Sequence, residues 1–175
     1  TNGDLGSGIY LNGSITDNNN APVINISSTA KISAEGQGIY AAGYGVWTIE
    51  EGASIEANTG IEIRAGELNV NGGTIIGTAI PTETTPNGNG STTTGAGIAV
   101  VQHTAFYESN PQKNSAEDLA AINLNITGGT FEAINGGTNS VYSEDFTAFI
   151  TGGTFNSDVV NYIANTYVVN ENNGT

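Results

Sequence analysis

The sequence predicts an all-β fold, a parallel β-helix (β-solenoid) of about six coils with a short helix capping its C-terminal end. The first reason is composition: glycine is abundant, with 25 copies in 175 residues, and only 37% of the residues are hydrophobic. This composition is typical of many short strands joined by turns. The second reason is that two short phrases recur at matched spacing. We expect residues 1–175 to form a single domain, and both phrases recur within it.

The first phrase is an apolar residue followed by a Gly-Gly-Thr turn. It occurs at residues 70–75, 126–131 and 150–155, and looser copies begin at Ile26 and Ile49. Successive copies are 23, 21 and 24 residues apart, except for one interval of 56 residues. Since matched phase stacks equivalent residues, we expect one inward ladder in the core, formed by Ile26, Ile49, Val70, Ile126 and Ile150.

Two insertions explain the long interval. Residues 81–94 are 14 residues without an apolar side chain, and residues 105–120 are 16 residues that are more charged. Removing both from the 56-residue interval leaves 26 residues, which is again one repeat. We therefore expect both segments to leave the stack as loops, with 81–94 mobile.

The second phrase is a Gly-Ile step, with an outward residue directly after it. It begins at Gly8, Gly38, Gly60 and Gly97, and a weaker Ser-Val copy begins at Ser140. Alternation over three to five residues predicts very short strands, and stacked coils lie about 4.8 Å apart. The coils are expected near residues 7–15, 22–43, 45–66, 67–103, 121–145 and 146–157. A β-sandwich also uses short strands, but it would not repeat one phrase at matching phase.

The C-terminal segment 157–169 is expected to close the stack. Ser157 or Asp158 is a suitable helix N-cap, and Val159, Tyr162 and Ile163 would share one helical face. An open end of a β-helix exposes unpaired strand edges, so a capping helix has a physical purpose here.

Charge and composition exclude several function classes. The net charge is −14, with Lys31, Arg64 and Lys113 as the fixed cations, so neither nucleic acid nor an anionic membrane is an expected partner. The sequence has no run of about 18 apolar residues, so we expect no membrane insertion. Cysteine is absent, which rules out disulfides and thiolate chemistry. A start at Thr1 without any Met is typical of a fragment of a longer protein.

A resemblance is found in residues 152–159, Gly-Gly-Thr-Phe-Asn-Ser-Asp-Val, followed by Tyr162, Ala164 and Tyr167. This ending resembles β-helical repeat segments of Gram-positive bacterial cell-surface proteins, and the Gly-Gly-Thr-Phe repeats are similar to pectate-lyase-like right-handed parallel β-helices. The resemblance implies a right-handed coil and a secreted or cell-wall protein. It carries no activity. The scarcity of cations, histidine and clustered acids favours a non-catalytic surface module, either an adhesin or a stalk segment.

A carbohydrate-active β-helix enzyme, either a polysaccharide lyase or a glycoside hydrolase, is the alternative. Lyases that this fold resembles use Arg or Lys as base, and Arg64 is the best candidate for that role. Glycosidases need two carboxylates about 5–10 Å apart. Aligning the Gly-Ile steps places Tyr40, Glu62 and Ala99 in one outward column, which supplies one acid. We therefore assign no catalytic residue and interpret Arg64 as a solvated surface side chain near Glu62.

Ligand binding is expected at aromatic and charged side chains on the outward column and the second insertion. A host glycan or a host protein is the expected partner, because exposed aromatic rings stack on sugars and anchor protein interfaces. The candidate residues are Tyr40, Glu62, Arg64, Phe106 and Tyr107. We expect no cofactor and no dedicated metal site. Calcium stays an alternative at residues 17–20 and 143–145, where oxygen ligands cluster, but solvated turns are the preferred interpretation of both stretches.

Overall fold

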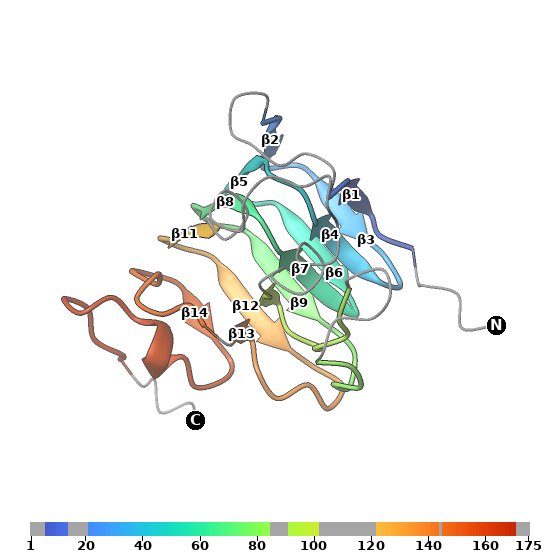
Figure 1. Cartoon of the computed structure of the whole chain (residues 1–175). Coiled ribbons are helices and arrows are strands. Elements are labelled where there is room, and N and C mark those ends of the chain that lie inside the picture. The colour runs from blue at the N-terminus through green and yellow to red at the C-terminus, as the bar shows by residue number, and fades with distance from the viewer. Residues whose placement is uncertain (1–5, 14–20, 85–90, 102–121, 144, 171–175) are drawn as a thin grey trace.

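A computed structural model describes residues 6–13, 21–84, 91–101, 122–143 and 145–170 of the chain, which form fourteen strands in three sheets (Figure 1). Sheet A contains β1 (Ile9–Leu11), β4 (Gln37–Ala41), β7 (Thr59–Ile63), β10 (Ile98–Val100) and β13 (Val141–Ser143). Sheet B contains β2 (Val23–Ile26), β5 (Val46–Ile49), β8 (Gly66–Val70) and β11 (Ile122–Ile126). Sheet C contains β3 (Lys31–Ser33), β6 (Ser54–Ala57), β9 (Thr74–Gly77), β12 (Thr130–Ala133) and β14 (Thr154–Phe155).

The strands enter the three sheets in a repeating order. β1, β2 and β3 belong to sheets A, B and C, and β4, β5 and β6 follow the same sequence of sheets. Each strand pairs in parallel with the strand one repeat away, as β4 does with β7 and β5 does with β8. The predicted all-β class with parallel pairing is therefore confirmed.

The predicted inward ladder lies in sheet B. Backbone pairing connects its five members in order along the chain, and all of them are buried. Ile163 adds a sixth position, since it pairs in parallel with Ile150. The expectation drawn from the spacing of the first phrase is confirmed, because equal repeat lengths keep equivalent residues at the same register.

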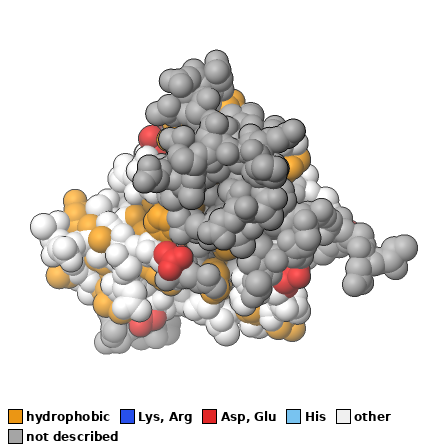
Figure 2. Space-filling view, in the orientation of Figure 1, with side chains coloured by type: hydrophobic (Ala, Val, Ile, Leu, Met, Phe, Trp, Pro, Cys, Tyr) orange, Lys and Arg blue, Asp and Glu red, His pale blue; other side chains and the backbone are white. Residues whose placement is uncertain are grey.

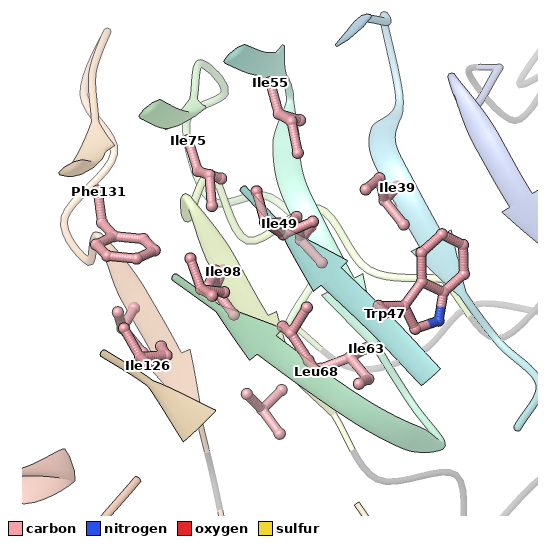
Figure 3. Packing of buried hydrophobic residues seen from close by; sticks show 14 of the residues in the cluster. Ile39, Trp47, Ile49, Ile55, Ile63, Leu68, Ile75, Ile98, Ile126 and Phe131 are labelled. Carbon is pink, nitrogen blue, oxygen red and sulfur yellow. The ribbon is translucent and has the colours of Figure 1, made fainter. Parts of the chain in front are cut away.

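Sheets A and C contribute their own columns to the same core (Figure 3). In sheet C, Ile55, Ile75 and Phe131 occupy paired positions and are fully buried. Phe131 also stacks on Phe155, with ring centroids 4.8 Å apart. Trp47, the single tryptophan of the chain, is 1% exposed among these side chains. It lies on β5, two residues before the ladder residue Ile49.

The Gly-Gly-Thr phrase recurs because each turn between sheets B and C stacks on the turn before it. Gly73 has a φ of +89°, a conformation that side chains with a Cβ rarely adopt. Its neighbour Gly72 is needed for space, since a Cβ there would lie 2.7 Å from the Cα of Glu51. The repeated phrase is thus a packing requirement of the turn.

The C-terminal segment differs from the predicted capping helix. Residues 157–169 contain a single 3-10 turn, η1 (Val160–Tyr162), and no α-helix. The chain leaves the turn at once because Ile150 donates its N–H to the carbonyl of Tyr162, and Ala164 donates its N–H to the carbonyl of Ile150. Pairing with sheet B therefore replaces helical hydrogen bonding. Val159 and Ile163 nevertheless pack against the core, as a cap requires.

Candidate functional site

The outward column predicted from the Gly-Ile phrase is present on sheet A. Backbone pairing aligns five residues, in the order Tyr10, Tyr40, Glu62, Ala99 and Tyr142. At the N-terminal end of the column, the rings of Tyr10 and Tyr40 stack with centroids 5.5 Å apart. Matched phase again explains the alignment, because the same residue of each repeat follows the inward isoleucine.

The exposure of this column differs from the expectation. Tyr40 is 6% exposed, Glu62 is 0% exposed and Arg64 is 1% exposed. The interpretation of Arg64 as a solvated surface side chain is therefore wrong. The middle of the column, Tyr40, Glu62 and Ala99, points away from the isoleucine core and is nevertheless buried, whereas Tyr10 at the N-terminal end is 56% exposed.

Residues 91–96 lie over the column and are held there by hydrogen bonds. The backbone N–H of Thr92 donates to both carboxylate oxygens of Glu62, at 3.1 Å each. The side-chain amide of Gln37 donates to the carbonyl of Thr92 at 3.0 Å and to the Glu62 carboxylate at 3.3 Å. The side chains of Glu62 and Gln37 thus hydrogen-bond to the backbone N–H and to the backbone carbonyl of Thr92, respectively.

A second set of hydrogen bonds fixes the same segment two residues further along. The backbone N–H of Thr94 donates to the hydroxyl of Thr59 at 3.3 Å, and the two hydroxyls are also 3.3 Å apart. The backbone N–H of Ala96 donates to the hydroxyl of Thr94 at 3.3 Å. The end of the first insertion is therefore hydrogen-bonded to sheet A at Thr92 and at Thr94, and both residues are almost fully buried.

The described residues at both ends of the 81–94 insertion are held by hydrogen bonds, while the mobility expected for the loop as a whole stays a prediction. The described parts of the insertion pair with each other, since Glu83 and Thr93 form an antiparallel bridge. The polar composition of 91–94, which suggested solvent exposure, instead supplies the hydrogen bonds to Glu62 and Thr59. Residues 85–90 lie outside the described part of the chain.

Electrostatics at the centre of the site are dominated by burial. Burial raises the pKa of Glu62 from its ordinary 4.5 to about 7, because an ionised carboxylate loses its hydration there. The Thr92 N–H, the charge of Arg64 and the Gln37 amide oppose this rise, since each favours the ionised form. The guanidinium of Arg64 lies close, with its Nη1 atom 3.6 Å from Glu62 Oε1.

The chemistry available at this site is limited by access and by the number of acids. Hydrolysis of a glycoside needs a carboxyl pair around the sugar, and a lyase needs a base that reaches its substrate. Glu62 and Arg64 are instead enclosed by the protein. Around them, the described neighbours in the column and in residues 91–96 are uncharged: tyrosine, alanine, serine, threonine and glycine.

The described residues contain no cluster of side chains that could ligate a metal ion. No group of three or more His, Asp or Glu side chains comes together there to hold an ion. On the face drawn in Figure 2, acidic side chains lie as separate spots among neutral and apolar ones. The expected calcium stretches both include residues outside the described part of the chain, at 17–20 and at 144.

Phe106 and Tyr107, the two other candidate ligand-binding residues, also lie outside the described residues, together with the rest of the second insertion. Their assignment stays a prediction. In the described parts of the chain, no helix is long and apolar enough to span a membrane.

Sequence reasoning missed Gln37, Thr59, Thr92 and Thr94, which form most of the hydrogen bonds around Glu62. One indication was present, since Gln37 and Thr59 each directly precede a Gly-Ile phrase and lie three residues before the column residues Tyr40 and Glu62. The three consecutive threonines at 92–94 gave no comparable indication, because polar residues in an insertion are ordinarily solvated.

Comparison with known protein families, with curated protein sequences and with solved structures finds no match to this chain.

Proposed function

We propose that this chain is a right-handed parallel β-helix of about six coils that serves as a non-catalytic module of an extracellular protein. In this proposal the protein belongs to the cell surface or cell wall of a Gram-positive bacterium, and the module acts as an adhesin or a stalk segment. Support for the helical coil comes from the repeating order of sheets and from the continuous ladder between Ile26 and Ile163. Support for the bacterial location comes from the resemblance of residues 152–159 to surface-protein repeats.

The observation that carries the non-catalytic assignment is the closure of the Glu62–Arg64 site. This pair offers the best chemistry on the outward column, yet both side chains are at most 1% exposed and Glu62 is hydrogen-bonded to the covering segment. An enzyme for a polymeric glycan needs an open groove beside its acid or base. A rigid stack with short strands is instead suited to holding binding loops in place.

The binding role is tested with the second insertion. We propose that a host glycan or host protein binds at Phe106 and Tyr107, and not at Tyr40, Glu62 and Arg64, which are buried. Replacing residues 105–120 with a short glycine linker is expected to abolish binding to an array of host glycans and matrix proteins while the thermal midpoint stays unchanged. A Lys31→Ala variant, altered at the start of the strand β3 in sheet C, serves as the control and is expected to bind normally.

Two results would contradict this assignment. Unchanged binding after the replacement would place the ligand elsewhere. A large fall in the thermal midpoint would show that the insertion is a structural cover rather than a recognition loop.

A carbohydrate-active enzyme is the second candidate, favoured by one specific observation. A buried carboxylate with a raised pKa beside a cation is a combination that active sites use often. Incubation with polygalacturonate, pectin and mucin glycans is expected to release neither reducing ends nor unsaturated products. Product formation that disappears in Glu62→Gln and in Arg64→Ala would establish the enzyme instead.

A further inference from the structure

The segment that covers Glu62 is attached in an unusual way, mainly through hydrogen bonds. Residues 91–94 are Ser-Thr-Thr-Thr, so the segment buries little apolar surface of its own. Segments with few apolar contacts open locally at a lower free energy than the core.

Backbone hydrogen bonds also hold the segment, from the Gly60 N–H to the Ala96 carbonyl at 2.9 Å and from the Thr93 N–H to the Glu83 carbonyl at 2.7 Å. The two attachments that involve side chains of sheet A differ in one chemical respect. At Thr94 the partner is the hydroxyl of Thr59, which does not titrate near neutral pH. At Thr92 the partners are the Glu62 carboxylate and the Gln37 amide, of which the carboxylate can gain or lose a proton. Proton binding therefore acts on one attachment and leaves the other unchanged.

We propose that residues 91–96 form a strap that opens and recloses over the outer face of sheet A, and that ionisation of Glu62 controls how often it opens. Opening would bring Glu62 and Gln37 into contact with water and uncover the polar surface between β4 and β7. Opening of the strap follows from the closed geometry and does not depend on the adhesin role.

The direction follows from proton linkage. In the closed strap burial raises the pKa of Glu62 to about 7, whereas in an open strap water reaches the carboxylate and its pKa falls back toward 4.5. The closed form therefore binds the proton more tightly. Acid favours the closed strap, and opening increases as pH rises through 7. For these two pKa values, linkage gives an increase in opening of roughly 25-fold between about pH 5.5 and about pH 8.

The charged and titratable groups that face Glu62 do not reverse this direction. Arg64 follows β7 and remains cationic throughout this range. Tyr40 on β4 flanks Glu62 on one side, while Ala99 on β10 flanks it on the other. Residues 91–96 carry no charge. Among the described residues around the strap, Glu62 is thus the group that titrates near neutral pH.

Amide hydrogen exchange measured by NMR tests the proposal directly, because the Thr92 N–H is itself the donor to Glu62. After correction for the intrinsic pH dependence of exchange, protection at Thr92 is expected to fall roughly 25-fold from about pH 5.5 to about pH 8. The Asn71 N–H, which donates to the carbonyl of Ile49 in sheet B, is the internal control and should show no such change.

Two variants separate the titrating attachment from the other one. Glu62→Gln should remove the pH dependence at Thr92. Thr59→Val should lower protection at Thr92 and Thr94 at every pH and keep the wild-type dependence, because it loosens the strap without removing the carboxylate. An equal pH dependence in the wild type and in Glu62→Gln would overturn the proposal, as would wild-type protection that does not vary with pH.

A direct titration keeps the proposal testable if Glu62→Gln does not fold. The carboxyl carbon of Glu62 can be followed by NMR in the wild-type protein across the same pH range. Its midpoint is expected to lie near 7 and to coincide with the midpoint of the exchange profile. A midpoint near 4.5, or one that does not coincide with the loss of protection, would refute the strap.

Discussion

Removing the side chain of Ile49 beyond its Cβ is the sharpest test of the stacked core. Ile49 is fully buried at the centre of the sheet B ladder, paired with Ile26 on one side and Val70 on the other. It also belongs to the same apolar cluster as Trp47 and Ile55. A substitution to alanine would leave a cavity that neighbours on rigid, hydrogen-bonded strands cannot easily fill.

Ile49→Ala is expected to lower the free energy of unfolding by roughly 2–5 kcal/mol. We expect the upper half of this range, because the neighbouring side chains can move little to fill the cavity. Ile49→Val removes one methylene and is expected to cost roughly 0.5–1.5 kcal/mol. Val23→Ala is the matched control, since Val23 lies in the same sheet but is 72% exposed. It should change the free energy by less than about 0.5 kcal/mol.

Urea unfolding followed by fluorescence provides the assay. Trp47 is the single tryptophan and is 1% exposed, so its emission should shift to longer wavelength when the core opens. The midpoint is expected to fall in the order Val23→Ala, Ile49→Val, Ile49→Ala, with the slope unchanged. A loss below about 1 kcal/mol for Ile49→Ala would refute the close-packed ladder.

Other predictions concern the turns, the aromatic stack and pH. Gly73→Ala should cost about 1–3 kcal/mol because of its positive φ, whereas Gly6→Ala, which has open space around it, should be nearly neutral in the same urea assay. Phe131→Ala should cost roughly 3–5 kcal/mol, since the ring is fully buried and stacked on Phe155, and calorimetry should show a lower thermal midpoint. Glu62 has a raised pKa in the folded state, so its stabilising contribution is complete below about pH 4.5 and is lost as pH rises through 7. The wild type should therefore lose on the order of 2 kcal/mol relative to Glu62→Gln between about pH 5.5 and about pH 8, and equal profiles for the two proteins would contradict this.

The sequence by itself determined the parallel all-β fold and the register of its strands. Ile26, Ile49 and Val70 could be aligned before any coordinates, and so could Tyr40 with Glu62, because the repeats have nearly equal length and the same phrase marks the same position in each. Register in such a stack follows from local spacing. A one-residue slip would turn the inward ladder to the outside, so the pattern leaves little freedom.

Only the tertiary structure decided what covers the outer face of sheet A. Gln37 and Thr92 are 55 residues apart, and no periodicity connects them. The strap residues resemble a solvated loop in composition, yet they are buried because their hydrogen bonds are made to the sheet instead of to water. The same reason applies at the C-terminus, where the pattern suited a helix but pairing of Ile163 with Ile150 prevailed. Such contacts depend on which distant groups meet after the repeats have stacked, and this information is absent from the spacing of the repeats.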